Sequence, residues 1–442
     1  MTQTTSAPPA TLSPPAPQAA PTGPQSSPAL TNSRQGAVRA WFAGTPGRMR
    51  AILILTAVVA VLFGAAAAQG FRQSEGALQR AEENTAQLVR IQAIHTNLVS
   101  ANANATNAFL VGGLEPPAQR QQFVDSMSTA AKLISEAATA QPADQEALGA
   151  LNATLLTYRG LIEQARANNR QGLPIGSQYL KDASASLQTD SLPLLNALVE
   201  ANEERVATEF NNVGKGSVWL YLAGLATLIV LGLTLYWLAR KTHRYLNVPI
   251  AAAAVLVLLT MLVGGTSLAS ASGAAEDTRG DAYADTLALS RARIAAFDAK
   301  SNESLTLIAR GSGAAFEEAW KKSSGTVDDQ IAASDTNGPG LTSLWSAYKS
   351  VHVAIRRDDD GGNWDQAVDK AIGSGGQTSN AAFATFDKQS GDSLSAVSDL
   401  TQANLADARN GLPPIAWLGL PIGIAAALLI VWGMSQRLEE YR

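Results

Sequence analysis

The residue types best suited to catalysis or metal binding are scarce in this sequence and lie far apart. The chain contains no cysteine, and its histidines are His95, His243 and His352. A Ser-His-Asp triad or a histidine-bound metal requires partner side chains at a spacing that these three do not provide. We therefore expect structural or surface histidines, no cofactor, no metal site and no enzymatic activity.

Two short segments have part of the composition of ligand-binding loops. Asp358–Asn363 reads DDDGGN, which contains elements of a calcium loop but lacks the terminal bidentate Glu. Gly214–Ser217 reads GKGS, the end of a phosphate-binding loop, but Glu209 occupies the place of its first glycine. We interpret the first segment as a polar helix stop and the second as a junction between a helix and a membrane span.

Basic and aromatic side chains offer another kind of site. Several basic residues could bind the carboxylates of an acidic amino acid, or could lie on solvated helix faces: Arg159, Arg166, Lys349, Arg356 and Arg357. Trp320, Trp345 and Trp364 could line a pocket, but a Trp on an apolar helix face usually belongs to the core. We favour the solvated faces and the core.

Four uncharged apolar stretches determine the organisation of the chain. They cover residues 51–69, 217–239, 248–271 and 413–434. Each has roughly 18–24 residues, enough to cross a hydrocarbon core of about 30 Å as a helix. In the last stretch Gly419 and Gly423 form a motif that permits close helix approach, although Pro421 lies inside it. These stretches predict a multi-pass protein of a bacterial plasma membrane.

Lys and Arg residues beside the spans predict the orientation of the chain. The pieces that they place in the cytoplasm are residues 1–50, 240–247 and 435–442, with nine basic and two acidic residues between them. Both termini are then cytoplasmic, and residues 70–214 and 272–412 face outward as two acidic modules. Their acidity argues against nucleic-acid binding. A signal peptide cleaved near Ala66–Ala68 is the alternative interpretation of the first span.

Each module has the periodicity of helices. Apolar residues recur at helical spacing, and Gly and Pro residues divide each module into four helices. The first and fourth helices have about forty residues, or roughly 60 Å, so they should outreach the inner pair and form a two-helix stem near the membrane. We expect the fourth helix of each module to continue into the following span. The predicted fold is all-α, with four transmembrane helices and two extracytoplasmic four-helix-bundle modules in tandem.

The two modules are similar to each other and define candidate contact sites at both ends. Asn104 matches Asn302 at one offset and Tyr158 matches Tyr348 at another, which indicates an internal repeat. The membrane-distal turns are our candidates for partner contact and contain Gly112, Gly113, Gly172, Gly311, Asp358, Asp359 and Asp360. The basic cluster at the inner ends of the spans is a candidate cytoplasmic contact or an anchor for anionic membrane lipid, and contains Arg240, Lys241 and Arg244. Residues 1–50 form a Pro-rich tail that should be disordered.

The stretches SANANATNAFLVGG and DAKSNESLTLIARG are similar to the sensory halves of bacterial chemoreceptors and sensor kinases. No HAMP, kinase or cyclase domain follows either module, so we expect the output to pass through a partner. The complete layout, with a Pro-rich tail, four spans and two outer helical modules, resembles the GlnX-type membrane proteins of actinobacteria. That resemblance implies a relay of acidic amino-acid sensing between a GlnH-like solute-binding lipoprotein outside and a PknG-like Ser/Thr kinase inside.

These features together predict a non-enzymatic transmembrane signal transducer. A partner outside the cell would favour one of two packings of the helices, and the spans would carry the change inward. Two alternatives remain: a chemoreceptor-like receptor that binds a small ligand directly, and a transporter-associated membrane scaffold. The uncharged spans argue against an ion path. A homo-oligomer is left open.

Overall fold

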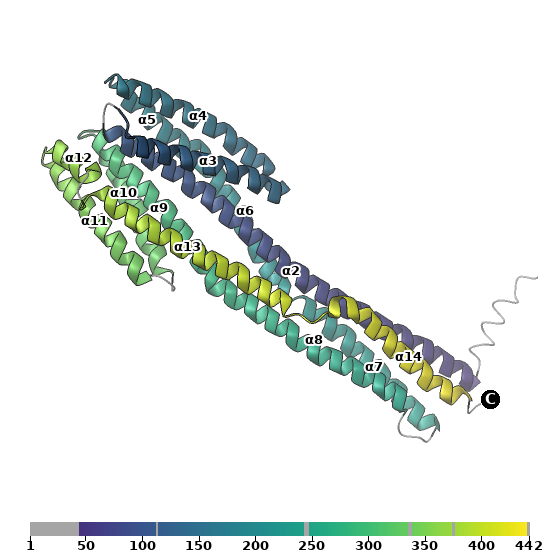
Figure 1. Ribbon diagram of the computed structural model, residues 1–442. Coiled ribbons are helices and arrows are strands. Elements are labelled where there is room, and N and C mark those ends of the chain that lie inside the picture. Colours follow the sequence, from purple (N-terminus) through teal and green to yellow (C-terminus); the bar gives the residue numbers. More distant parts are fainter. Residues whose placement is uncertain (1–43, 112–113, 243–246, 335–337, 374–375, 440–442) are drawn as a thin grey trace, which may run out of the picture.

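The chain folds into an elongated helical structure with an apolar half and a polar half (Figure 1). The computed structural model describes residues 44–111, 114–242, 247–334, 338–373 and 376–439. This described part contains helices and no strand, so the all-α prediction is confirmed there. The helices are α2 (Gly44–Leu110), α3 (Pro117–Ala140), η1 (Pro142–Asp144), α4 (Gln145–Arg170), α5 (Ile175–Ser186), η2 (Leu187–Ser191), α6 (Leu192–Val213), α7 (Gly216–Thr242), α8 (Val248–Gly280), α9 (Ala282–Ile308), α10 (Ala314–Ala332), α11 (Gly338–Asp360), α12 (Trp364–Ile372), α13 (Ser379–Asn410) and α14 (Ile415–Glu439).

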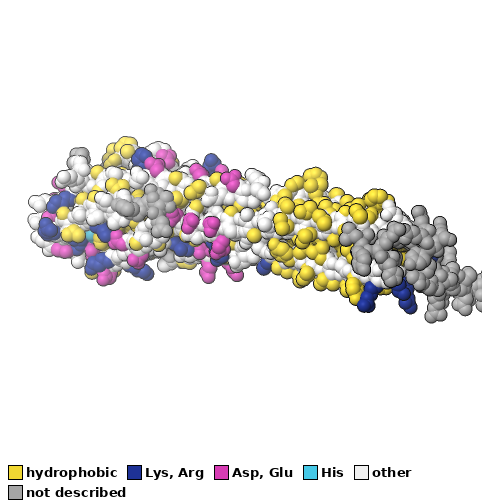
Figure 2. Space-filling view, turned by 90° about the horizontal axis from the view of Figure 1, so that it is seen from below, with side chains coloured by type: hydrophobic (Ala, Val, Ile, Leu, Met, Phe, Trp, Pro, Cys, Tyr) yellow, Lys and Arg dark blue, Asp and Glu magenta, His cyan; other side chains and the backbone are white. Residues whose placement is uncertain are grey.

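The apolar half, called the apolar bundle below, consists of α7, α14, residues 51–69 of α2 and residues 248–271 of α8. Each of its four helices contains a window with a mean hydropathy between 2.1 and 2.6. Large side chains face outward from it, such as Leu62, which is 60% exposed, and Leu222, which is 64% exposed. Figure 2 shows a broad hydrophobic surface beside a half that carries charges of both signs. Since so large an exposed apolar surface requires lipid, the four helices indicate a multi-pass membrane protein.

Aromatic side chains mark both edges of the apolar bundle. Trp219 and Trp417 are exposed at the edge next to the modules, and Tyr236 and Trp432 are exposed near the opposite edge. The helical path from Trp219 to Tyr236 is roughly 26 Å long at 1.5 Å per residue. This length is close to the thickness of the hydrocarbon core, and Trp and Tyr prefer the two interfaces of a bilayer.

Glycines allow α2 to approach its neighbours closely inside the apolar bundle. A Cβ atom on Gly64 would lie only 2.4 Å from the carbonyl oxygen of Gly419 and 2.7 Å from Cα of Gly423. The motif that the sequence predicts for close helix approach therefore packs within the chain, between α14 and α2. At the edge next to the modules, a Cβ on Gly70 of α2 would lie 2.5 Å from the carbonyl oxygen of Gly216 of α7.

Each module has its own cluster of large buried side chains, and Val99 and Ala103 of α2 also pack into the cluster of the second module. In the first module, α4 is the predicted third helix. Its predicted apolar face is buried and comprises Leu148, Leu151, Leu155, Tyr158 and Ile162. In the second module Trp345, Tyr348 and Phe386 are fully buried, and Trp320 is 7% exposed. The prediction of core tryptophans is thus confirmed for Trp320 and Trp345, while Trp364 is half-buried.

Between the modules and the apolar bundle, the long helices of both modules form one stem. Leu88 of α2, Val206 of α6, Ala275 of α8 and Leu405 of α13 belong to a single buried cluster. An ion pair of 2.8 Å between Arg409 and Glu82 joins α13 to α2 across the stem. The helix lengths predicted paired stems, and the structure confirms them.

The fourth helix of the first module continues into the following span, as predicted, but with a short break at the junction that the sequence pattern did not predict. α6 ends at Val213, a turn at Gly214 and Lys215 follows, and α7 begins a new helix. Glycine on both sides of Lys215 weakens the helix at this point. Further upstream, Pro193 cannot donate a backbone hydrogen bond, and the residues before it form the π-helical segment η2.

The corresponding helix of the second module is also divided. α12 and α13 are separate helices, and α13 ends at Asn410. The next residues include Pro413 and Pro414, which have no N–H group to extend the ladder, and α14 starts at Ile415. By contrast, α2 runs for 67 residues from the apolar bundle to the far end of the first module without a break.

We predict that Gly64→Ala lowers the melting temperature of the detergent-solubilised protein. The added Cβ would meet backbone atoms of α14, which cannot move aside, and overpacking of this kind costs about 1–3 kcal/mol. Gly232→Ala is the matched control on α7, because no atom lies within 4 Å of the new Cβ. That variant should be neutral or more stable by up to roughly 1 kcal/mol. Equal melting temperatures for the two variants would contradict the α2–α14 contact.

Candidate functional site

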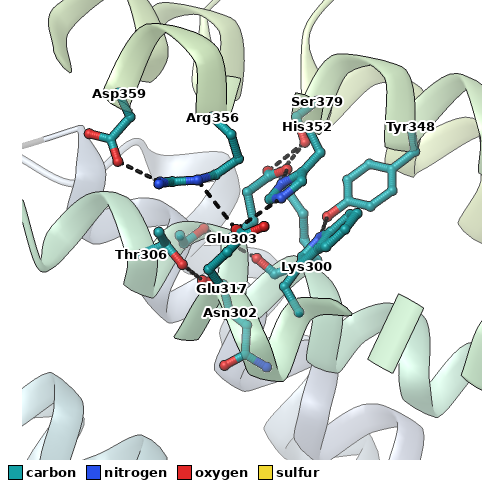
Figure 3. A network of polar contacts seen from close by, with 12 residues as sticks. Lys300, Asn302, Glu303, Thr306, Glu317, Tyr348, His352, Arg356, Asp359 and Ser379 are labelled. Carbon is teal, nitrogen blue, oxygen red and sulfur yellow. Dashed lines mark hydrogen bonds and ion pairs between the residues drawn. The ribbon is translucent and has the colours of Figure 1, made fainter. Parts of the chain in front are cut away.

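A network of charged side chains is buried in the second module, between α9, α11 and α13 (Figure 3). Glu303 is at its centre. Its Oε1 atom lies 2.7 Å from Nζ of Lys300 and accepts a 2.6 Å hydrogen bond from the hydroxyl of Ser379. Its Oε2 atom lies 2.9 Å from Nδ1 of His352. The side chains of Lys300, Glu303 and His352 are at most 5% exposed.

Local helix geometry brings these residues together. Lys300 and Glu303 share one face of α9 because they are three residues apart. Ser379 is the first residue of α13, after the N-cap Thr378, whose side chain accepts a hydrogen bond from the backbone N–H of Ala381. The carboxylate of Glu303 is therefore next to a helix N-terminus, where the helix dipole favours negative charge.

A second layer connects the network to α10. Nε2 of His352 lies 3.2 Å from Oε2 of Glu317, and Nε of Arg356 lies 3.4 Å from the same oxygen. The indole of Trp320 stacks on the imidazole of His352 with 3.6 Å between ring centroids. Its Nε1 donates a 3.2 Å hydrogen bond to the hydroxyl of Tyr348. Polar contacts therefore join α9, α10, α11 and α13.

The environment of the network favours the charged forms of Glu303 and His352 and the neutral form of Tyr348. Burial alone would raise the pKa of Glu303, but Lys300 and His352 lower it to about 2. Burial would lower the pKa of His352, but its hydrogen bonds to Glu303 and Glu317 raise it above the usual value. The pKa of the Tyr348 hydroxyl is raised far above its usual value, chiefly by burial.

These contacts suit a structural role for the network and leave no group free for catalysis among the described residues at its centre. Both oxygens of Glu303 and both ring nitrogens of His352 already have protein partners, and the centre is closed to solvent. A paired and buried network of this kind favours one arrangement of the helices, because any other arrangement would leave a charge unpaired. The network therefore holds the second module in one packing.

A neutral polar cluster occupies a similar place in the first module and reaches across to the second. Oδ1 of Asn102 accepts hydrogen bonds from Ser184 at 3.0 Å and from Tyr158 at 3.4 Å. Nδ2 of Asn102 donates a 2.8 Å hydrogen bond to the hydroxyl of Ser301 on α9. Asn102 thus joins α2, α4, α5 and α9, and it connects the two modules.

Two of the candidate glycines at the tips lie in turns between helices. Gly172 has φ +68° in the turn between α4 and α5, and Gly311 has φ +83° in the turn between α9 and α10. Both angles fall in the region that glycine adopts without strain. Gly112 and Gly113 lie outside the described residues.

The acidic tip of the second module is neutralised by its own basic neighbours. Asp358 pairs with Lys370, and Arg356 pairs with both Asp359 and Asp360. Nearby, the Nε1 atom of Trp364 donates a 2.8 Å hydrogen bond to the carbonyl oxygen of Leu307, which fixes α12 against the end of α9. The segment therefore has the geometry of a helix stop. Within the described ranges, no group of three or more His, Asp and Glu residues is arranged to hold a metal ion.

The candidate cytoplasmic residues lie at the opposite end of the molecule. Arg240 and Lys241 occupy the last turn of α7, where the guanidinium of Arg240 lies 5.2 Å from the ring centroid of Tyr236. Lys241 is exposed, and Arg244 lies outside the described residues. The two described residues are on one surface, which either an anionic lipid or an acidic protein could approach.

The basic residues considered for an acidic ligand do not form one site. Arg166 is paired with Glu115 at 3.0 Å and with Glu163 at 2.9 Å, and the cavity next to it has a volume of only about 60 Å³. Lys349 is paired with Asp328 at 2.8 Å, and Arg159 and Arg357 are exposed. Arg356 belongs to the buried network. A cavity of that size holds water but no amino acid.

Sequence reasoning missed the central members of the network. Lys300 and Glu303 have the spacing of an exposed helical ion pair, and His352 was interpreted as structural or surface without partners. One signal was present in the sequence: from Ala295 to Ile308 the polar residues are too closely spaced to leave one purely apolar face. A helix with this pattern must either be exposed or pair its polar groups internally.

Comparison with known proteins identifies a family for the first module. Residues 77–211 match a family described as an actinobacterial sensor domain. The match begins on α2 in the stem and ends on α6, so it contains all the inner helices of the first module. No curated protein and no solved structure matches the chain. The fold and the match together define a helical protein that carries a sensor domain and four helices able to span a membrane.

We predict that His352 makes the second module more stable in acid than in base. The pKa of His352 is higher in the folded state than in the unfolded state. Its contribution to the free energy of unfolding is therefore fully present below the unfolded pKa of about 6.5 and is lost as the pH rises through the folded pKa. The difference in melting temperature between the wild type and His352→Gln should therefore decrease between pH 6 and pH 9. Thermal unfolding in detergent across that range measures it.

His95→Gln is the matched control for this prediction. Burial lowers the pKa of His95 to about 4, so its imidazole is neutral in the folded state at pH 6 and above. The difference in melting temperature between the wild type and His95→Gln should increase from about pH 4 to pH 6.5 and stay constant above that pH. A constant difference for His352→Gln from pH 6 to pH 9 would show that His352 is not held in its charged form.

Proposed function

We propose that this protein is a non-enzymatic transmembrane signal transducer with its two modules outside the plasma membrane and both termini in the cytoplasm. The observation that carries the proposal is the continuity of α2, which passes from the apolar bundle through the stem into the first module as a single helix. The match of residues 77–211 to a sensor-domain family supports a sensory role and favours a non-catalytic one.

The packing of α2 explains how a change in the modules would reach the membrane. In the modules α2 contacts α3, α6 and α9, and in the apolar bundle it contacts α7 and α14. At the membrane edge Gly70 meets Gly216 of α7, and deeper in the bundle Gly64 meets α14. Close backbone contacts transmit a shift or rotation because there is no flexible side chain to absorb it.

The resemblance to GlnX-type proteins extends this proposal to two partners. A solute-binding lipoprotein that detects glutamate or aspartate would contact the membrane-distal turns, including those with Gly172 and Gly311. A cytoplasmic Ser/Thr kinase would respond at the surface that contains Arg240 and Lys241. The pairing of Asp358–Asp360 with Arg356 and Lys370 makes shape, more than net charge, the feature that a partner would recognise there.

We predict opposite labelling of the two ends of the molecule in intact cells. The natural chain has no cysteine, so single cysteines can be introduced without background. Gln171→Cys, in the exposed turn between α4 and α5, should react with a membrane-impermeant maleimide, and Lys241→Cys should react only after permeabilisation. The reverse pattern would overturn the proposed orientation.

We predict that a flexible interruption of α2 abolishes the relay. Insertion of three glycines between Arg72 and Gln73 would break the single helix just above the Gly70 contact. Cytoplasmic Ser/Thr phosphorylation should then no longer respond to external glutamate or aspartate, whereas the wild type responds. Phosphoproteomics before and after addition of these amino acids measures the response, and immunoblotting confirms an unchanged amount of protein in the membrane.

The same insertion between Lys215 and Gly216 is the matched control. The helix is already interrupted there by a turn, so most of the response should remain. If phosphorylation in cells with the α2 insertion responds as in the wild type, the continuity of this helix does not carry the signal.

A further inference from the structure

A cleft of about 470 Å³ lies on the seam between the two modules. α2 and α6 of the first module form one wall, and α9 and α10 of the second module form the other. The residues that matter for its chemistry are Gln92, His95, Asn196, Asp298, Asn302 and Thr326. Its volume is in the usual range for sites that bind small molecules.

Two deeply buried side chains that line this cleft have unused hydrogen-bonding groups. Gln92 is 3% exposed, and neither its amide nitrogen nor its amide oxygen has a partner among the described residues. His95 is 6% exposed, and its Nε2 atom is likewise without a partner in the described part of the chain. Leaving a buried polar group unpaired is unfavourable, so two such residues in one cleft require an explanation.

Asp298 adds an unpaired negative charge to the same cleft. Its side chain is half-buried, its carboxylate has no ion pair or hydrogen bond within the described residues, and desolvation by the surrounding helices raises its pKa to about 7. The basic residues that line the cleft do not neutralise it: Arg291 pairs with Glu203, and Lys322 is exposed on α10. Burial keeps His95 neutral, with a pKa of about 4, so Nε2 can accept a hydrogen bond.

These groups define the chemistry of a complementary ligand. Asp298, the Gln92 oxygen and His95 Nε2 are three acceptors, and a primary ammonium group has three donors and a positive charge. The Gln92 nitrogen, which donates, would suit an oxygen next to that ammonium group. An ammonium group on Asp298 would also neutralise a desolvated carboxylate that has no partner among the described residues.

We propose that the cleft between the modules binds a small primary amine that carries an adjacent oxygen acceptor, the pattern shared by amino acids and amino alcohols. Asp298 binds the ammonium group, and Gln92 and His95 complete its coordination. This inference rests on the proposed sensory function and gives it a ligand site. Because Gln92 and His95 are on α2 and Asp298 is on α9, the ligand bridges the modules and favours the packing in which these helices are closest.

Binding to the full-length protein in lipid nanodiscs tests the proposal. The probes are the proteinogenic amino acids and ethanolamine, with glycolate and acetate as amine-free controls. The measurements are the shift in melting temperature and calorimetry at pH 8, where Asp298 is ionised. At least one amine should raise the melting temperature and bind with measurable heat, and the amine-free acids should do neither.

Variants assign the binding to the cleft. Asp298→Asn keeps the shape of the side chain, removes its negative charge and should weaken binding of that amine at least 10-fold. Its melting temperature without ligand should equal or exceed that of the wild type, which separates lost binding from lost folding. Gln92→Leu should also weaken binding while the fold is retained. Asp392→Asn, on an exposed surface ion pair with Lys388, should bind like the wild type.

Three outcomes would overturn the inference: no amine in the panel binds, the amine-free acids bind equally well, or Asp298→Asn binds with wild-type affinity. If the amine-binding experiments fail but the α2 insertion still abolishes the cellular response, the proposed function is not contradicted. If amines bind but the α2 insertion has no effect, the cleft remains a ligand site and the relay through α2 is wrong.

Discussion

The structure depends on one constraint: α2 must pack continuously in three different environments. In lipid its backbone has to be fully hydrogen-bonded internally, which enforces an unbroken helix. In the stem and the first module it packs against other helices through residues such as Leu88 and Leu98. Glycines at Gly64 and Gly70 bring α14 and α7 against it at backbone distance. The spans in α7 and α14 can therefore join their modules through turns, since α2 already fixes the geometry between the two halves.

The modules share a plan but differ in core chemistry. With the offsets that align Asn104 to Asn302 and Tyr158 to Tyr348, Lys300 takes the place of Asn102. In the first module that position holds a neutral amide bonded to Tyr158. In the second it holds a lysine 5.8 Å from the ring centroid of Tyr348 and paired with Glu303. A charged network has fewer acceptable arrangements than a neutral one, so we expect the second module to keep its helix packing more strictly than the first.

The sequence predicted features that depend on local pattern. Apolar runs predicted the four span helices. Helical spacing predicted the buried face that includes Leu148 and Tyr158, and the predicted helix lengths indicated a two-helix stem for each module. The charged network could not be found in this way, because Glu303 and His352 are 49 residues apart and their contact arises only from tertiary packing. The turns at Gly214 and before Ile415 had local Gly and Pro signals, but the adjoining apolar runs obscured them. The unpaired state of Asp298 depends on both modules and has no local signature.

The distribution of satisfied and unsatisfied polar groups indicates where the molecule can change shape. The network around Glu303 is fully paired, so moving α11 or α13 relative to α9 would break several strong contacts at once. The seam between α2 and α9 is different: Asn102 and Ser301 form a hydrogen bond, but the side-chain amide of Gln92 and Nε2 of His95 have no partner among the described residues. Apart from the apolar contacts of Val99 and Ala103, a shift along this seam would therefore break fewer polar contacts than a shift within the second module, and switching elements are drawn from regions of low stability. Since α2 is also the helix that enters the membrane unbroken, a small movement at the seam is delivered directly to the apolar bundle.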